Sequence, residues 1–134
     1  MRVAALVGSS GAGKTTAIVA LIEHYTHQGL RVGAMKHTHH EINDRDEGDT
    51  ALMRRAGASP VILAGESEAV VFDGVSRRTR FNDPRELLVH FDGCDIVLIE
   101  GFRKVRSWPR VELASDNRRS VTELVANLDR IWRS

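Results

Sequence analysis

The sequence predicts an α/β fold in which a mostly parallel sheet lies between helical layers, with an added β-hairpin. Apolar runs of strand length alternate with stretches of helical periodicity, and this alternation is typical of parallel βαβ units. The runs are continuously apolar, as expected of strands that are covered on both faces. An Asp-Gly pair between two β-prone segments predicts the hairpin.

The first half of the chain begins with an apolar strand and an amphipathic helix. Ile18, Leu21, Ile22 and Tyr25 recur at helical spacing, and Gly29 closes that helix. A polar, aperiodic stretch after the second strand indicates a loop. The expected elements are strand 3–7, the helix up to Gly29, strand 31–35, loop 37–48, a short helix 49–55 that ends at Gly57, and strand 61–63.

The second half adds the hairpin, two further strands and two helices. Asp73-Gly74 is expected at a turn in which both central residues have positive φ. Pro84 is suited to the first turn of a helix, and Ser120 with Glu123 forms a capping-box pattern. The expected elements are strands 69–72 and 75–81, a helix from Pro84, strands 96–99 and 111–113, and a terminal helix after Ser120.

Length and composition bound the function. The 134 residues fit a single domain over 1–134, and 42% hydrophobic with 28% charged residues is ordinary for a globular protein. The formal net charge of +1 does not direct the chain to nucleic acid or a membrane, and no apolar stretch reaches the roughly 20 residues of a membrane helix. The single cysteine, Cys94, predicts a buried inert thiol, and we expect a cytoplasmic protein.

Residues 8–15, GSSGAGKT, match the phosphate-loop pattern G-x-x-x-x-G-K-[ST] at every position. Small residues let successive backbone N–H groups point at phosphate oxygens, and the following helix N-terminus adds a positive dipole end. The lysine of the pattern then contacts the β and γ phosphates, and the Ser or Thr hydroxyl binds Mg²⁺. The pattern predicts a phosphate-loop NTPase fold whose nucleotide-binding residues are Gly8, Ser9, Ser10, Gly11, Ala12, Gly13, Lys14, Thr15 and Thr16.

Two carboxylates are candidates for the chemistry beside this loop. Glu100 ends the apolar strand 96–99, where an acidic residue of a phosphate-loop protein contacts the magnesium shell or orients water. Asp49 is either a magnesium or water contact or the cap of the short helix. We therefore expect Lys14, Asp49 and Glu100 as the catalytic set, with Thr15 and Glu100 as metal ligands.

Three histidines, His37, His39 and His40, follow the second strand. Their density suggests metal binding, but the segment has no neighbouring cysteine, and His-x-His-His alone has poor geometry for one ion. The carboxyl end of a parallel strand is a ligand-binding position, so the favoured interpretation is hydrogen bonding to phosphate or to a partner's ligand. An exposed polar loop is the plain alternative.

Basic residues gather in two segments, Arg77 to Arg80 and Arg103 to Arg110. A solvated positive surface explains these basic patches, and the alternative is a surface that recognises an anionic ligand or an acidic partner, with Arg103 as a candidate contact. Trp108 is a candidate interface anchor within that segment.

The sequence resembles the MobB family, the molybdopterin-guanine dinucleotide biosynthesis adaptor proteins. The resemblance rests on the phosphate loop, on KHTHH at 36–40, on GDT at 48–50, on RAGA at 55–58 and on LIEGF at 98–102, and it runs from Val3 to about Leu113. It implies GTP and magnesium binding, weak GTP hydrolysis, a nucleotidyltransferase partner that joins GMP to the molybdopterin cofactor, and a homodimer. No Asn-Lys-x-Asp motif is present, so the preference for guanine comes from the resemblance alone.

Two other functions remain open at this point. A small-molecule kinase would need a mobile basic lid, for which only Arg77 to Arg80 qualify. A non-catalytic interaction module would use the nucleotide only to order a binding surface. The hairpin, with an exposed sheet edge, is the candidate dimer element.

Overall fold

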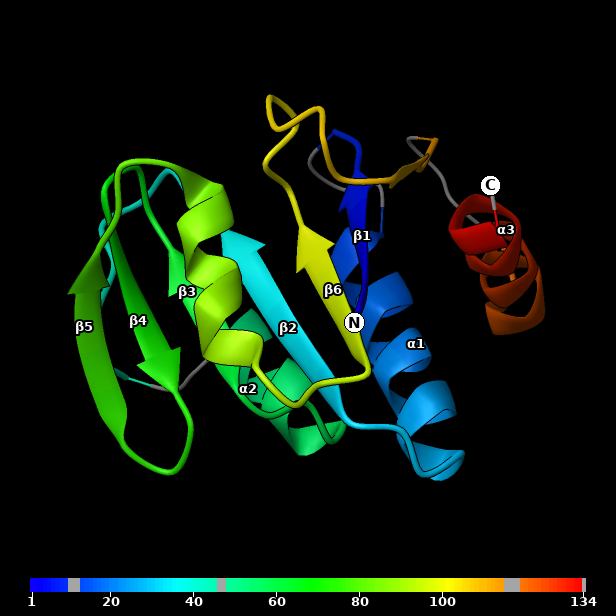
Figure 1. The fold of residues 1–134 in the computed structure, drawn as a ribbon, viewed down its shortest axis with the longest axis horizontal. Coiled ribbons are helices and arrows are strands. Elements are labelled where there is room, and N and C mark those ends of the chain that lie inside the picture. The colour runs from blue at the N-terminus through cyan, green and yellow to red at the C-terminus, as the bar shows by residue number, and fades with distance from the viewer. Residues whose placement is uncertain (10–12, 46–47, 115–118, 134) are drawn as a thin grey trace.

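The structure, a computed structural model, describes residues 1–9, 13–45, 48–114 and 119–133. Among these residues, one seven-stranded sheet has the order β5-β4-β3-β2-β6-β1-β7 (Figure 1). The predicted α/β architecture with a mostly parallel sheet and an added hairpin is confirmed.

The centre of the sheet is parallel. Strand β1 (Arg2–Val7) lies between β6 (Ile96–Glu100) and the edge strand β7 (Arg110–Glu112), and β2 (Val32–His37) lies between β6 and β3 (Val61–Ala64). Strands β4 (Glu68–Phe72) and β5 (Ser76–Arg80) extend the sheet in antiparallel pairs. The carboxyl ends of β1, β2 and β6 therefore meet at one edge, where parallel sheets bind ligands.

Helices cover both faces of the sheet, as predicted. One core joins Ala4, Ala34 and Leu98 of the sheet to α1 (Lys14–His27), α2 (Asp49–Arg55) and α3 (Val121–Arg133). The other core joins Ala5, Met35 and Ile99 to the 3₁₀ helix η1 (Pro84–Phe91), which lies in front of the sheet in Figure 1. Because strand side chains alternate between faces, neighbouring residues of one strand serve different cores.

Three local expectations are corrected. The segment after Pro84 is a 3₁₀ helix, capped by the Asp83 side chain, which accepts from the Arg85 N–H. The hairpin loop has three residues, 73–75, and only Gly74 has a positive φ, at 103°. Strand β2 continues to His37, two residues beyond the predicted end, because its register with β6 persists to Lys36 opposite Glu100.

Other local expectations are confirmed. Ser120 and Glu123 exchange the two hydrogen bonds of a capping box, at 3.4 Å and 3.2 Å. Cys94 is buried, and this burial raises the pKa of its thiol, as expected of an unreactive cysteine. Within the described part of the chain, no helix combines the length and apolarity that crossing a bilayer requires.

Gly33 of β2 is required by the packing of η1. A Cβ at this position would lie 2.3 Å from Phe91 Cδ1, and Phe91 is fully buried. We expect Gly33→Ala to lower the free energy of unfolding by about 1–3 kcal/mol, the usual cost of overpacking a core. Urea denaturation measures the change. Val89→Ala at an exposed position of η1 is the control and should stay within about 0.5 kcal/mol of the original chain; an equally stable Gly33→Ala would contradict the packing argument.

Candidate phosphate and metal site at the carboxyl edge of the sheet

A buried carboxylate marks the end of the central strand. Glu100 is 3% exposed and lies in register with Leu6 of β1 and Lys36 of β2. Its side chain is on the face covered by α1 and α2. The Lys36 ammonium lies 3.2 Å from Glu100 Oε2 and supplies the opposite charge that a buried carboxylate requires.

The first turns of two helices add polar groups to this carboxylate. Thr15 Oγ1, at the start of α1, lies 2.6 Å from Glu100 Oε1 and 3.2 Å from Asp49 Oδ2. Asp49 is the first residue of α2, whose N-cap is Gly48, and its carboxylate pairs with Lys36. The interpretation of Asp49 as a helix cap is therefore wrong, and the structure gathers one hydroxyl, two carboxylates and one ammonium.

The charge on Lys36 depends on this arrangement. Burial alone lowers the pKa of its ammonium, but hydrogen bonds and attraction from Asp49 and Glu100 outweigh burial and raise the pKa above 10.5. Lys36 is therefore fully protonated at neutral pH. One cation holds two carboxylates side by side.

The phosphate-loop residues that the structure describes lie beside this cluster. Gly13, with φ of 83°, is the N-cap of α1, so Lys14, Thr15 and Thr16 occupy the first turn. The Lys14 ammonium donates a hydrogen bond to the Gly8 carbonyl at 2.9 Å. Ser9 is exposed, and Ser10, Gly11 and Ala12 lie outside the described residues. A pocket of about 340 Å³ is lined by Gly13, Lys14, Thr15, Thr16, Lys36, His37, Asp49, Glu100 and Gly101.

His37 follows Lys36 on β2 and therefore faces the opposite side of the sheet. Its imidazole stacks on the Phe102 ring, with centroids 4.1 Å apart and planes inclined by 8°. Gly101 makes this contact possible, because its φ is 95° and a Cβ there would lie 3.1 Å from His37 Cβ. Phe102 itself has a positive φ of 56°. The turn after β6 thus fixes the orientation of the His37 ring.

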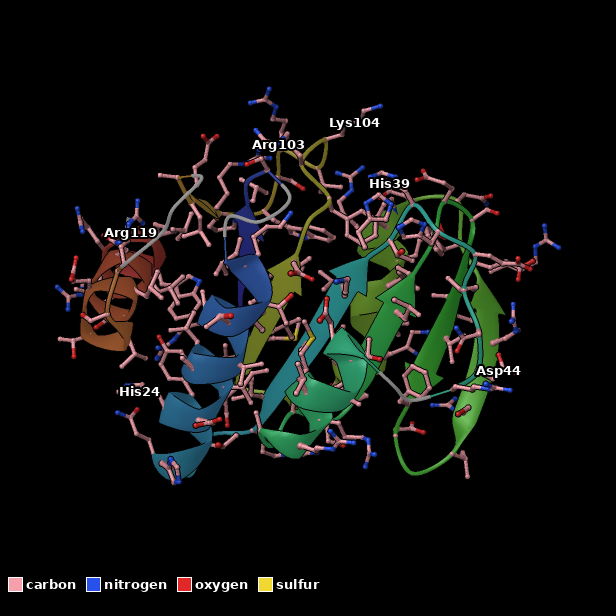
Figure 2. The ribbon with its side chains drawn as sticks, turned by 180° about the vertical axis from the view of Figure 1, so that it is seen from behind. His24, His39, Asp44, Arg103, Lys104 and Arg119 are labelled. Carbon is pink, nitrogen blue, oxygen red and sulfur yellow. The ribbon has the colours of Figure 1, made fainter. Side chains whose placement is uncertain are left out.

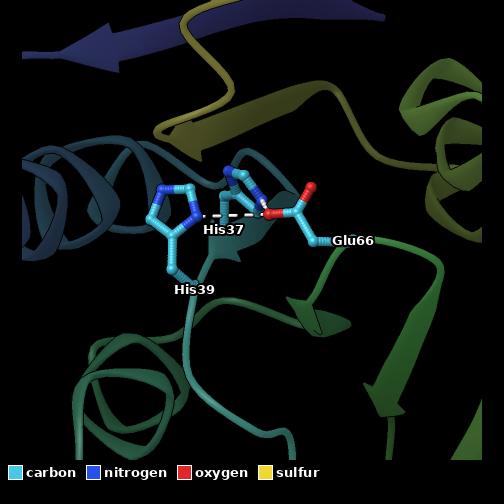
Figure 3. Close-up of side chains that lie close together, drawn as sticks. All are labelled: His37, His39 and Glu66. Atoms are coloured by element: carbon cyan, nitrogen blue, oxygen red, sulfur yellow. Dashed lines mark hydrogen bonds and ion pairs between the residues drawn. The ribbon is translucent and has the colours of Figure 1, made fainter.

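Glu66, in the turn between β3 and β4, connects two of the three histidines. Its Oε1 lies 3.2 Å from His37 Nε2 and 3.2 Å from His39 Nδ1 (Figure 3). Burial lowers the pKa of His37, and the nearby histidines, His37 first, lower the pKa of the Glu66 carboxyl. His40 is exposed and lies outside this cluster.

A second, larger cavity adjoins the phosphate loop on the η1 side. It has a volume of about 1090 Å³ and shares Lys14, His37 and Gly101 with the smaller pocket. The segment after β6 gives this cavity a basic wall of Arg103, Lys104 and Arg106. Figure 2 shows the exposed side chains of Arg103 and Lys104 at the same edge of the molecule as His39.

One expectation about the basic segments is corrected, and the described residues do not provide the lid that the kinase alternative would need. Trp108 is 6% exposed and packs edge-on against Phe102, with centroids 5.9 Å apart, so it is a core residue and not an exposed interface anchor. Arg77 to Arg80 belong to the sheet-edge strand β5, which β4, β3, β2 and β6 separate from β1. Arg78 pairs with Asp44 and Glu68 at that edge, so these residues do not form a lid over the phosphate loop.

Sequence reasoning missed Lys36, Glu66 and Phe102. Lys36 had a readable signal, because it precedes the histidines at a strand end and so shares the ligand-binding edge with Glu100. Glu66 had none, since its position beside His39 depends on β3 lying next to β2. Phe102 was visible only as part of a family motif.

Comparison with known proteins decides the family. The sequence profile of MobB, described as Molybdopterin guanine dinucleotide synthesis protein B, matches residues 3–132. The chain belongs to the MobB family. The resemblance seen in the sequence motifs is thereby confirmed over nearly the whole chain.

Curated relatives of this MobB-family chain are named molybdopterin-guanine dinucleotide biosynthesis adapter proteins. The protein from Haemophilus influenzae is 33% identical over 102 residues, covering 74% of this chain and 56% of the relative. The protein from Escherichia coli is also 33% identical over 102 residues, covering 70% of this chain and 55% of the relative. The chain therefore matches little more than half the length of these relatives.

Solved structures agree with the fold. The Bacillus subtilis MobB structure is 29% identical, with a TM-score of 0.52 over 94% of this chain and 73% of that chain. A MobB homologue from Bacillus stearothermophilus is 25% identical, with the same TM-score over 96% of this chain and 71% of that one. The seven-stranded mixed sheet with helices is thus the fold of MobB proteins.

The charge cluster at Glu100 makes a stability prediction. In Lys36→Met the buried Glu100 carboxylate loses its cation, so the free energy of unfolding should fall by about 1–3 kcal/mol. Urea denaturation at neutral pH measures it. The Lys36→Arg control keeps the charge, and Lys36→Met combined with Glu100→Gln should recover part of the loss.

The same variants give a pH test with a defined sign. Because the pKa of Lys36 is raised above 10.5 in the folded chain, its stabilisation is complete below that pH and disappears as the pH rises through the folded pKa. The stability difference between the original chain and Lys36→Met should shrink accordingly. A difference that stays constant through this range would contradict the pairing.

Proposed function

We propose that this chain is a GTP-binding adapter protein in the formation of molybdopterin guanine dinucleotide. In this role it binds GTP with magnesium, hydrolyses it weakly, and assists a molybdenum cofactor guanylyltransferase that attaches GMP to the molybdopterin cofactor. Membership of the MobB family and the names of the curated relatives support the pathway. The site residues below are proposed from this chain's own geometry.

One observation supports nucleotide binding above all others. The hydroxyl of the phosphate-loop residue Thr15 meets the Glu100 and Asp49 carboxylates at the carboxyl edge of the parallel sheet. In phosphate-loop proteins this hydroxyl and an acid from a neighbouring strand hold the magnesium of a bound triphosphate. Thr15 and Glu100 are 85 residues apart in the sequence. A glycine-rich turn that matched the phosphate-loop pattern by chance would not explain the contact between them.

The donor set fits magnesium. Mg²⁺ prefers oxygen ligands and usually takes one or two carboxylates together with phosphate oxygens and water. Thr15 and Glu100 would hold it, with Asp49 as a further contact or a water-orienting group. When bound, the ion would neutralise charge on the β and γ phosphates. The Lys36 ammonium offsets part of the negative charge of the Asp49 and Glu100 carboxylates.

The remaining residues would bind the phosphates. The first turn of α1 contains no acidic residue, so its free N–H groups and dipole favour an anion. Lys14, with Gly8, Ser9, Gly13 and Thr16, would grip the polyphosphate, and Ser10, Gly11 and Ala12 complete the proposed loop. Of the described residues that line the smaller pocket, none is an arginine or glutamine, which supports slow hydrolysis.

The larger cavity is suited to the second ligand of an adapter. Its basic wall of Arg103, Lys104 and Arg106 lies next to the phosphate loop and would attract a phosphorylated pterin. His37, His39 and His40 border or approach this cavity as candidate contacts with the cofactor or the partner. We take residues 1–134 as one nucleotide-binding domain and place it in the cytoplasm, where a single buried cysteine stays reduced.

Removing the phosphate-loop ammonium tests nucleotide binding. Lys14→Ala should weaken the binding of GTP by at least about tenfold, because a direct charge contact to phosphate is worth 1.5–3 kcal/mol. Its thermal melting should match that of the original chain, since among the described residues the one side-chain hydrogen bond of Lys14 is to the Gly8 carbonyl. Isothermal titration with GTP and ATP, with and without Mg²⁺, measures both affinity and base preference.

The matched control is Lys104→Ala, which removes an exposed ammonium from the larger cavity and should leave GTP affinity unchanged. Equal affinity of Lys14→Ala and the original chain would remove the central argument for a nucleotide site. Tighter binding of ATP than of GTP would contradict the proposed guanine preference.

We propose a homodimer in which the free edge of β5 pairs with its symmetry mate. Among the described strands, β5 is the last of the sheet and pairs with β4 alone, and such edges readily pair with another chain. Sedimentation velocity over a range of concentrations should show a reversible dimer that weakens in Arg78→Glu. A monomer at every concentration would contradict the dimer.

A further inference from the structure

We propose that His37, His39 and Glu66 form a binding site for a divalent transition-metal ion of the zinc class, distinct from the magnesium site at Thr15 and Glu100. One ligand atom from each of the three side chains lies within 4.8 Å of the other two (Figure 3). The site is on the η1 side of the sheet edge, whereas Glu100 and Lys36 are on the α1 side.

The spacing of these atoms agrees with the dimensions of a zinc site. Zinc bonds to histidine nitrogen and carboxylate oxygen at about 2.0–2.2 Å, and the edges of such a tetrahedron are about 3.3–3.6 Å long. Both His37 Nε2 and His39 Nδ1 lie 3.2 Å from Glu66 Oε1. The third edge, between the two imidazole nitrogens, is at most 4.8 Å long, and the exposed His39 ring is the side chain that would turn inward to shorten it.

The donor chemistry selects the kind of ion. Imidazole nitrogens are preferred by zinc and its first-row neighbours, whereas magnesium prefers a shell of oxygens. Two histidines and one carboxylate are the protein ligands of zinc sites that keep a fourth position for water or substrate. Here that position would lie toward the larger cavity, which both histidines and Glu66 line.

The structure holds the His37 side chain and the backbone at Glu66 in place before an ion arrives. His37 is held by its stack on Phe102 and by the close approach of Gly101. Glu66 is in a tight turn in which the Gly65 N–H donates to the Glu68 carbonyl at 2.8 Å, and the Thr38 N–H ties the histidine segment to Ala64, also at 2.8 Å. His37, with a side chain only 14% exposed, is the fixed ligand, whereas the Glu66 and His39 side chains are 75% and 81% exposed and can adjust to an ion.

This site does not depend on nucleotide binding, so its test uses zinc alone. Untagged, chelator-treated full-length chain is titrated with Zn²⁺ against a chromophoric chelator, in excess Mg²⁺ to occupy the carboxylate site. We expect one tightly bound zinc per chain. Cobalt in place of zinc should give the intense visible absorption of a tetrahedral ion.

Two single variants assign the ligands. His39→Ala and Glu66→Gln should each lower zinc affinity by about 10- to 100-fold or more, because even the loss of an outer partner of a ligand has that effect. Glu66→Gln retains an oxygen that can accept a hydrogen bond, so a purely hydrogen-bonding role would leave this variant normal. Both positions are exposed, and melting of the metal-free variants confirms that they fold.

His40→Ala is the matched control, since His40 is the adjacent exposed histidine outside the cluster, and it should bind zinc as the original chain does. Failure of the original chain to bind zinc, or unchanged zinc affinity in His39→Ala, would overturn the proposal. Neither result would affect the test of nucleotide binding with Lys14→Ala.

Discussion

The ion pair between Glu100 and Lys36 is the interaction on which the whole carboxyl edge depends. A carboxylate that is 3% exposed needs a cation, and parallel register of β6 with β2 places Lys36 directly beside it. The same two side chains then position Thr15 and Asp49, which begin different helices. The pairing of β6 with β2 therefore places the carboxylate of the proposed magnesium site, and the phosphate-loop residue Thr15 reaches this carboxylate from the start of α1.

Much of the fold could be predicted because its signals are local. Continuous apolar runs predicted β1, β3 and β6. The Ser120–Glu123 pair predicted the start of α3, and the Asp-Gly pair predicted the position of the hairpin. The misses have physical causes. The 3₁₀ form of η1 and the three-residue hairpin loop depend on backbone geometry that residue type alone does not determine. Trp108 looked exposed because polar neighbours surround it in the sequence, but it packs on Phe102.

The site was predictable to the extent that its residues end strands or begin helices. Lys14, Thr15 and Glu100 meet those criteria, and the structure brings Thr15 and Glu100 together. Glu66 could not be found this way, because its meeting with His39 follows from the neighbouring positions of β2 and β3. Sequence reasoning gave little weight to metal binding at the histidines for want of a further ligand. Tertiary structure supplies that ligand from a turn 27 residues away.

Lys36 and His37 are consecutive residues of one strand and point to opposite faces of the sheet; Lys36 lines the smaller pocket, and His37 lines both pockets. A peptide unit shared in this way cannot rotate for one side alone. Any energetic communication between occupants of the two faces must also be mutual: whatever factor the first changes in the affinity of the second, the second changes equally in the first. His37, which both pockets share with Lys14 and Gly101, thus gives a direct route by which a nucleotide could affect a ligand in the larger cavity.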